Sequence, residues 1–282
     1  MRLPPRYVSE LLELIQPICC LEGFVTVDAL QAIIGKAGRV AYVVLAAKPF
    51  VSGLWGGFTG ALNEVSSSKR SAPPGSVACR RVCYAACWVR ALLSGAEDCP
   101  LSLERLVGPG FASPPVAGDW SIEFDASIYG GGAVLHDGSG TVKEFFSVVW
   151  FGDEASHLRI EPGLTKHQTF WVFSTLLLSL IVWGDRFVTD TVMVVGDNTA
   201  ALTNALSLDG KGDLRHVARE LSWRQARRGW SFIVGHLPSE HNLVADALSR
   251  VAMGHEWPAL ALASATQVSA PRLRDLWLAA PR

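Results

Sequence analysis

The second half of the chain places short apolar runs between turn residues, in a pattern typical of an α/β domain. Apolar and polar residues alternate in 120–127, and further strand-like segments cover 131–137 and 142–150. Alternation of this kind predicts strands with one buried face, and short glycine-containing turns join antiparallel neighbours. The three segments therefore predict an antiparallel meander.

Helical patterns and two further strands follow the meander. The predicted elements are a helix over 166–183, a strand over 191–195, helices over 199–206 and 213–228, a strand over 230–234, a loop over 236–242 and a helix over 243–252. Strands joined through helices run parallel in one sheet. The predicted fold class is thus α/β: a mixed sheet of five strands, three antiparallel and then parallel, flanked by helices.

The first 118 residues are mainly helical by the same criteria. Helices are predicted over 7–15, 27–34, 39–47, 50–62 and 77–93, with Thr26 before the second, a glycine-rich break at 35–38 and a loop at 69–75. Proline and glycine gather in 109–118 and predict a domain boundary there. The expected organisation is a helical region 1–118, an α/β domain 119–252 and a C-terminal tail 253–282. The tail is rich in Ala and Pro after Trp257, and we expect that part to be poorly fixed.

Composition supports packed domains and gives no global attraction to nucleic acid. The 282 residues are 49% hydrophobic, and the formal net charge is −1. Residues 1–118 hold 11 Lys/Arg against 8 Asp/Glu, and residues 119–282 hold 14 against 18. An acidic half can still bind phosphates when its carboxylates hold divalent cations.

The cysteines indicate a reducing environment. All six lie in the first hundred residues, and Cys79, Cys83 and Cys87 repeat every four residues, which predicts one helix face. This is no zinc-finger spacing, so small buried packing is favoured. We expect an intracellular protein, in cytoplasm or nucleus, because no secretory signal pattern opens the chain. The apolar run 170–183 is interrupted by Ser and Thr and is short for a membrane span.

Three acidic residues occupy comparable places in the predicted sheet. Asp125 lies within the first strand, Asp197 follows the fourth, and Asp246 lies in the first turn of the last helix. Each alone could be a turn or capping residue, but in a mixed sheet these ends can converge on one crevice. Clustered carboxylates repel one another unless a cation screens them, and Mg²⁺ prefers oxygen ligands. His236, ten residues before Asp246, is placed to pass protons.

Three stretches carry a resemblance to a known superfamily. FDASIYGGGAVL, VVGDNTAAL and GHLPSEHNLVADALSR resemble the first, third and fourth motifs of ribonucleases H. The resemblance covers about 119–252 and is strongest to the ribonuclease H domain of retroelement reverse transcriptase polyproteins, whose last motif often reads N-x-x-A-D-x-L-S-R. It implies cleavage of the RNA strand of RNA–DNA hybrids with two Mg²⁺ (or Mn²⁺) ions. The residues that it assigns are Asp125, Asp197 and Asp246 as metal ligands, His236 as a catalytic residue, and Asn198, Asn242 and Arg250 as substrate contacts.

The second motif departs from the family pattern. Its Glu stands near the start of the first long helix, where this chain has Val172, and valine cannot bind a metal ion. Glu161 could substitute only if the helix began differently. The resemblance therefore implies a retained fold with weakened activity, or an inactive nucleic-acid-binding or decayed retroelement fragment. An integrase-like or exonuclease relative remains an alternative, against which the antiparallel opening and the Asn-x-x-Ala-Asp ending argue.

The helical region has a softer resemblance of its own. LQAIIGKAGRVAYVVLAAKPFVSGLWGGF is similar to the thumb and connection that follow a reverse-transcriptase palm, and no Tyr-x-Asp-Asp polymerase motif occurs. The resemblance implies a piece of a longer polymerase polyprotein. Its expected partners are an RNA–DNA hybrid and the rest of that polyprotein, with no membrane.

Overall fold

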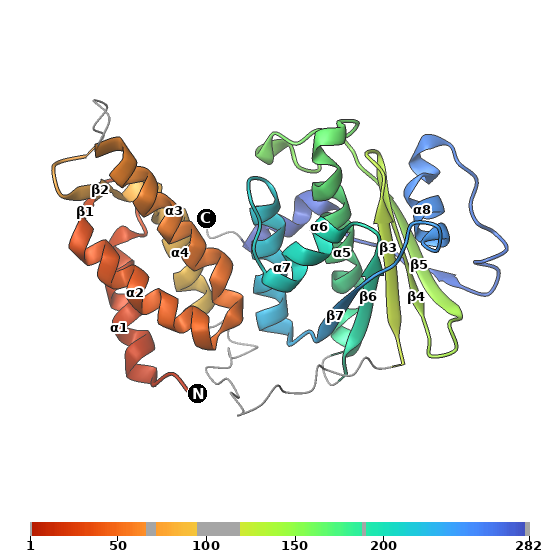
Figure 1. Cartoon of the computed structure of the whole chain (residues 1–282), viewed down its shortest axis with the longest axis horizontal. Helices are drawn as coiled ribbons and strands as arrows, with labels where there is room; N and C mark the ends of the chain where they lie inside the picture. The colour runs from red at the N-terminus through yellow and green to blue at the C-terminus, as the bar shows by residue number, and fades with distance from the viewer. Residues whose placement is uncertain (1, 66–71, 95–118, 188–189, 280–282) are drawn as a thin grey trace. The chain divides into compact units, whose positions relative to one another are not determined.

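The computed structural model describes residues 2–65, 72–94, 119–187 and 190–279, and it divides the chain into two compact units (Figure 1). One unit comprises 1–109 with 279–282, and the other comprises 110–278. The domain boundary expected at 118 lies beside residues outside the described ranges, so it stays a prediction.

The N-terminal unit is mainly helical, with one small ladder. Its elements are α1 (Pro5–Ile15), β1 (Phe24–Thr26), α2 (Val27–Val43), α3 (Lys48–Val65), β2 (Ser76–Ala78) and α4 (Cys83–Leu93), with 3-10 turns η1 (Gln16–Ile18), η2 (Leu45–Ala47) and η3 (Cys79–Arg81). Strands β1 and β2 pair antiparallel, with Phe24 opposite Ala78. As predicted, the Thr26 side chain caps α2 by accepting a hydrogen bond from the Ala29 amide at 3.2 Å.

The helix break predicted at 35–38 is wrong. Helix α2 continues to Val43 because its buried stripe continues on both sides of the glycines, through Ile34, Ala37 and Val40. A glycine in a helix interior costs about 1 kcal/mol relative to alanine. Burying several large apolar side chains outweighs that cost.

The helix predicted over 77–93 begins six residues later than expected. Ser76–Ala78 instead forms β2, and the 3-10 turn η3 separates it from α4. Pairing with β1 overrides the local helical pattern, which a single segment cannot reveal. Cys79 therefore lies outside the helix that carries Cys83 and Cys87.

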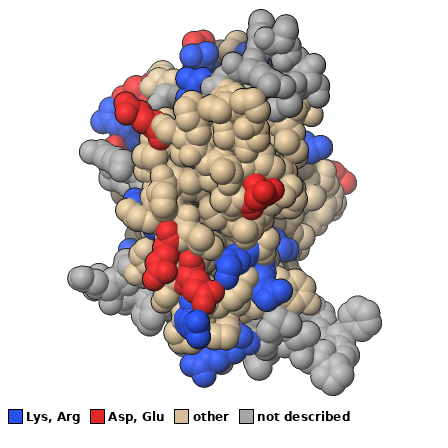
Figure 2. Space-filling view, turned by 90° about the vertical axis from the view of Figure 1, so that its left-hand side faces the viewer, with Lys and Arg blue, Asp and Glu red and all other residues tan. Residues whose placement is uncertain are grey.

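The visible face of the N-terminal side of the molecule carries mixed charges. Figure 2 shows basic and acidic side chains interspersed around broad uncharged areas, with neither sign forming a continuous surface.

The C-terminal unit is a mixed α/β domain. Its strands and helices are β3 (Ser121–Ala126), β4 (Gly130–His136), β5 (Val142–Val149), α5 (Gln168–Trp183), β6 (Val192–Gly196), α6 (Thr199–Ser207), α7 (Leu214–Arg228), β7 (Phe232–His236), α8 (Leu243–Ser249) and β8 (Thr266–Gln267). Shorter 3-10 turns are η4 (Ser156–Leu158), η5 (Thr165–His167), η6 (Gly184–Phe187), η7 (Val251–Met253) and η8 (Leu273–Ala279).

The sheet confirms the predicted fold class and adds one strand. Its order is β7-β6-β3-β4-β5-β8, with β3, β4 and β5 antiparallel and β6 and β7 parallel to β3. Helices α5, α6 and α7 lie on one side of the sheet and α8 on the other (Figure 1). The parallel strands β3 and β6 are neighbours, so the acidic residues at their C-terminal ends lie at the same end of the sheet.

Helix α5 is the centre of the core. Its side chains are buried without interruption from Phe170 to Leu180, which explains why its sequence is apolar on all sides. Among the described residues, Thr165–Phe187 is the one helical stretch long and apolar enough to cross a membrane. Within it, 78% of the 18-residue apolar window is buried inside the protein. A buried core helix has this composition for packing reasons alone.

The expectation of a poorly fixed tail is wrong. Strand β8 pairs parallel with β5, and Leu273 and Leu276 enter the main core. The Arg272 guanidinium donates from Nε to buried Glu154 at 2.8 Å. These partners lie more than a hundred residues away in the sequence, so tail composition does not reveal them.

Replacing Leu273 with alanine tests this packing. Its side chain is 1% exposed, and we expect the free energy of unfolding to fall by about 2–4 kcal/mol through lost burial and a residual cavity. The matched control is Leu260→Ala, at a side chain 95% exposed, with an expected change within about 0.5 kcal/mol. Urea denaturation of the full chain measures both, and equal effects would show that the tail is not packed.

Candidate active site

Asp125 is a nearly buried carboxylate on the central strand. Along β3 the side chains of Ile122, Phe124 and Ala126 are buried in the main core, so Glu123 and Asp125 lie on the opposite face. Asp125 pairs with Gly132 across the β3–β4 ladder and is 8% exposed. Burying a carboxylate in a strand is costly without a partner.

Two glycines of β4 let α8 approach this strand. A Cβ built on Gly132 would lie 2.8 Å from the Ser249 amide nitrogen, and one on Gly130 would lie 2.8 Å from the Ser249 carbonyl oxygen. Both are closer than side chains tolerate. These two glycines therefore seat α8, which carries Asp246.

Asn242 and Glu123 fasten the start of α8 to β3. The Asn242 side chain is 1% exposed and donates from Nδ2 to the Phe124 carbonyl oxygen at 3.2 Å. The Ala245 amide donates to Glu123 Oε1 at 3.3 Å. Asn242 was assigned to substrate contact by resemblance. The buried side chain holds α8 against β3, and its contact with a substrate stays a prediction.

Asp197 and Asp246 approach Asp125 from two other elements. Asp197 directly follows β6, and its Oδ2 accepts a hydrogen bond from Ser239 Oγ at 2.7 Å. Asp246 Oδ1 accepts from the Arg250 guanidinium at 2.7 and 2.9 Å. The structure thus brings the three predicted acids to one place, with Arg250 as counter-ion of one of them.

The pKa of Asp125 is raised by its burial and by the two neighbouring acids. Burial, the negative charge of Asp197 and the neighbouring Asp246 together raise this pKa to about 7, against the hydrogen bond from the Ala126 amide, which lowers it. Near neutral pH the Asp125 carboxyl therefore lies close to its titration point. A bound cation would favour its charged form.

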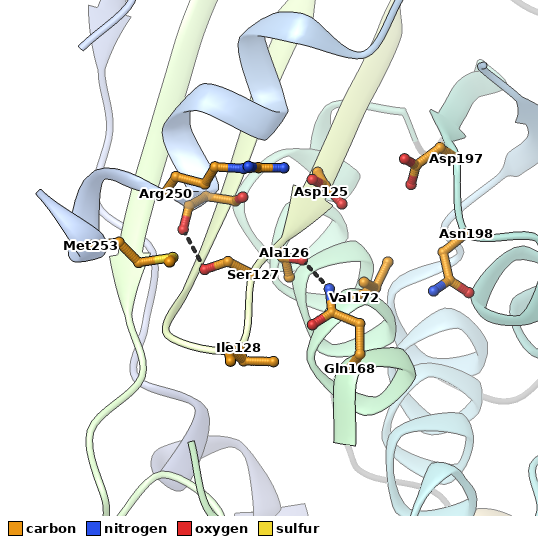
Figure 3. A pocket seen from close by; sticks show the side chains of 11 residues that line it. Asp125, Ala126, Ser127, Ile128, Gln168, Val172, Asp197, Asn198, Arg250 and Met253 are labelled. Atoms are coloured by element: carbon orange, nitrogen blue, oxygen red, sulfur yellow. Dashed lines mark hydrogen bonds between the residues drawn. The ribbon is translucent and has the colours of Figure 1, made fainter. Parts of the chain in front are cut away.

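Asp125 and Asp197 line an open pocket of about 540 Å³, together with Arg250, the ion-pair partner of Asp246 (Figure 3). Its lining residues are Asp125, Ala126, Ser127, Ile128, Gln168, Val172, Asp197, Asn198, Ser249, Arg250 and Met253. Asn198 caps α6 by accepting from the Ala201 amide at 2.9 Å. Its amide nitrogen points toward the pocket in Figure 3, a position suited to its predicted substrate contact.

Val172 forms part of the pocket wall on α5. It is one turn after Gln168, whose Nε2 donates to the Ala126 carbonyl oxygen. The position where the resemblance expects a Glu thus faces the acids with an apolar side chain. Glu161 is exposed and does not line the pocket, so it does not replace the missing carboxylate.

His236 ends β7 rather than lying in the predicted loop. It is exposed and pairs with Gly196, the residue before Asp197, across the β6–β7 ladder. It does not line the pocket but lies at the same edge of the sheet. Its role in proton transfer stays a prediction.

Several pocket residues were not predicted from the sequence. Gln168, Ile128 and Met253 line the pocket, and Ser127 joins the β3–β4 turn to the end of α8 by donating to the Ser249 carbonyl oxygen at 2.7 Å. Gln168 lies four residues before Val172, a spacing that places both on one face of a helix. That spacing was the one available signal for it.

The donor chemistry of the pocket suits a hard cation, although its geometry is incomplete. Carboxylate oxygens are the ligands that Mg²⁺ prefers. Among the described residues, no group of three or more His, Cys, Asp or Glu side chains is arranged to hold a metal ion. The carboxylate of Asp246 forms an ion pair with Arg250 instead of being available to a metal ion. Val172 has no oxygen with which to bind one.

The solved structures similar to this chain include ribonucleases H. Ribonuclease H1 of Halobacterium salinarum NRC-1 shares 16% identity with a TM-score of 0.36, covering 49% of this chain and 97% of that chain. LC11-RNase H1, isolated from compost, shares 19% identity with a TM-score of 0.37 over 48% of this chain and 94% of its own. A second structure of it holds an RNA/DNA hybrid.

A viral polymerase structure is similar over a longer part of the chain. The foamy viral protease-reverse transcriptase in complex with double-stranded DNA shares 14% identity with a TM-score of 0.29, covering 84% of this chain and 36% of that chain. No family model and no curated protein matches the chain. The fold assignment therefore rests on the strand order and register of the chain itself.

Replacing Asp125 with asparagine should stabilise the metal-free protein at pH 8. A carboxyl group whose folded pKa is raised favours folding at low pH, and this contribution is lost as pH rises from about 4 to about 7. The uncharged amide avoids the loss, so the free energy of unfolding should rise by roughly 1–3 kcal/mol at pH 8. Denaturation in EDTA at pH 8 and pH 4 measures it, and a loss of stability at pH 8 would contradict the crowding.

The pair beneath α8 should give a second pH dependence. His136 Nε2 lies 3.2 Å from Glu123 Oε2, and its Nδ1 lies 3.2 Å from the Gly140 carbonyl oxygen. The hydrogen bond with Glu123 raises the pKa of His136, whereas burial opposes the shift. Its stabilisation is full below the unfolded pKa near 6.5 and is lost as pH rises through the folded pKa.

We therefore expect His136→Gln to cost about 1 kcal/mol at pH 6 and less at pH 9. The matched control is His241→Gln, at an exposed histidine. Its unfolding free energy should change little at either pH. Denaturation series at the two pH values compare the variants, and an effect of His136→Gln that did not vary with pH would refute the ionic pairing.

Proposed function

We propose that the C-terminal unit is a ribonuclease H-like domain of a retroelement polymerase that binds RNA–DNA hybrids and cleaves their RNA strand slowly. The observation that carries this proposal is that Asp125 of β3 and Asp197, which follows β6, line one open pocket, while Asp246 of α8 lies close enough to Asp125 to raise its pKa. The motif resemblance of the same three stretches supports it independently.

Asp125 and Asp197 would hold a Mg²⁺ or Mn²⁺ ion, with Asp246 once it leaves Arg250. Such an ion activates a water and stabilises the leaving oxygen of a phosphodiester. Asn198 is placed to donate to the substrate from its amide. Arg250, freed from Asp246, is placed to contact a phosphate. His236 at the end of β7 would take up and release protons at the same sheet edge.

Slow cleavage of the hybrid follows from the residue that α5 contributes to the pocket wall. Val172 offers no oxygen where the family has a carboxylate, so at least one ion is held by fewer ligands. A specific alternative is a binding module without activity. The Asp246–Arg250 pair favours it, because a guanidinium already neutralises one acid without a metal ion.

Substituting Val172 with glutamate tests the proposal. We expect Val172→Glu to raise the rate of hybrid cleavage in Mg²⁺ roughly tenfold or more, equivalent to about 1.4 kcal/mol of barrier. Val172→Gln is the matched control, because it has the same size without the charge and should leave the rate unchanged. A labelled hybrid resolved on a denaturing gel gives the rates, with Asp125→Asn as the inactive reference.

The outcomes separate the two functions. Cleavage by the native chain that Asp125→Asn abolishes supports an active enzyme and excludes the binding module. Hybrid binding without cleavage by the native chain, with activity appearing in Val172→Glu, identifies a binding module with a repairable site. No binding and no cleavage in any variant would overturn both.

A further inference from the structure

A basic side chain reaches the acidic pocket from the end of α8. Among the described residues that line the pocket, Arg250 is the one with a basic side chain, and it directly follows α8. Its guanidinium extends toward Asp125 (Figure 3). The side chain of Arg250 is 48% exposed, and that of its partner Asp246 is 36% exposed. Both charged groups are therefore accessible to ions from solvent.

The guanidinium of Arg250 binds one carboxylate oxygen through two of its nitrogens. Nε lies 2.9 Å and Nη2 lies 2.7 Å from Asp246 Oδ1. Carboxylate oxygens are also the ligands that a hard divalent cation prefers. A guanidinium and a cation at the same carboxylate repel each other, because both are positively charged. Arg250 and a cation therefore compete for Asp246.

Main-chain bonds fix the point from which Arg250 reaches Asp246. The carbonyl oxygen of Arg250 accepts from the Met253 amide at 2.8 Å. The preceding carbonyl oxygen, of Ser249, accepts from Ser127 Oγ of the β3–β4 turn at 2.7 Å. Release of Asp246 thus requires rotation of the Arg250 side chain and no change in the backbone.

The pair also has an ordinary structural explanation. An acid four residues before a base on a helix forms a surface pair that stabilises the helix slightly. A pair of this kind exchanges partners easily. The surroundings distinguish it from other surface pairs, because Asp125 and Asp197 line the adjoining pocket and attract a further cation. A purely structural role predicts no effect of Arg250 on cation binding.

We propose that Arg250 is an internal competitor of the divalent cation, which holds Asp246 until a cation displaces it. Arg250 thereby raises the cation concentration at which the site fills. This inference rests on the proposed function for the cation site and adds how occupancy of that site is controlled. The apparent affinity for the cation is reduced to the fraction of molecules in which Arg250 has left Asp246.

Arg250 and Val172 hinder cation binding in different ways. Val172 lacks an oxygen, so the ligand is absent at any cation concentration. Arg250 withholds a ligand that is present, so a sufficient cation concentration restores it. Removing the guanidinium should therefore improve cation binding even while Val172 remains in place.

Titration of the full chain with Mn²⁺ tests this competition without relying on cleavage. Free Mn²⁺ is followed by electron paramagnetic resonance in the absence of nucleic acid. We expect Arg250→Met, which keeps the length of the side chain without its charge, to tighten Mn²⁺ binding about tenfold. Arg250→Lys keeps the charge but loses the second nitrogen donor, so it should tighten binding less.

Two further variants separate competition from a general effect of charge. Arg228→Met is the matched control, because Arg228 forms an exposed ion pair with Asp185 at 3.2 Å and does not line the pocket. Its loss should change Mn²⁺ affinity by less than about twofold. In an Asp246→Asn background, Arg250→Met should tighten binding by no more than about threefold, because only the repulsion between the two cations is then relieved.

The outcomes decide the proposal in either direction. Tightened binding in Arg250→Met that a further Asp125→Asn substitution abolishes supports the competition. Unchanged or weaker binding in Arg250→Met, an equal gain in Arg228→Met, a gain that survives Asp125→Asn, or no Mn²⁺ binding by any variant would overturn it. The proposed function fails separately, when neither the native chain nor Val172→Glu binds or cleaves a hybrid, whatever the Mn²⁺ titrations give.

Discussion

Electrostatic repulsion between carboxylates at the ends of β3, β6 and α8 is the constraint around which the C-terminal unit is built. Asp125 is nearly buried, and its neighbours Asp197 and Asp246 raise its pKa further toward neutrality. Such an arrangement weakens the folded state whenever all three groups are charged. The surrounding structure must therefore hold them together by interactions that do not depend on the acids themselves.

Those interactions lie on both faces of the sheet. On one face, the buried side chains of α5 pack against β3 and fix the strand. On the other, the glycines of β4 let α8 approach closely, and Asn242 and Glu123 bond its first turn to β3. The position of Asp246 is thus set by hydrogen bonds to main-chain groups and by backbone contact, which explains how a repulsive cluster persists.

The sequence predicted what local patterns and motifs encode. The alternation of apolar and polar residues predicted the antiparallel meander, and the long apolar run predicted the helix α5. The misses share one cause: β2 and β8 depend on partner strands distant in sequence, and the continuous α2 depends on burial of its apolar stripe. Local propensity registers neither. In the site, the motifs foresaw the convergence of Asp125, Asp197 and Asp246. They did not foresee the burial of Asn242 or the place of Gln168, because both depend on how α8 and α5 pack against β3.

Val172 and Arg250 change the charge of the pocket in the same direction. A valine in place of a carboxylate removes one negative charge, and the Arg250 guanidinium offsets that of Asp246. Asp125, with a pKa raised to about 7, carries only part of a charge near neutral pH. Asp197 accepts its hydrogen bond from the neutral Ser239 hydroxyl rather than from a cation. A pocket of this charge attracts a divalent cation less strongly, and it repels a phosphate backbone less strongly as well. Under the proposed function, the same two residues would weaken ion-dependent hydrolysis and ease the approach of a nucleic acid without an ion.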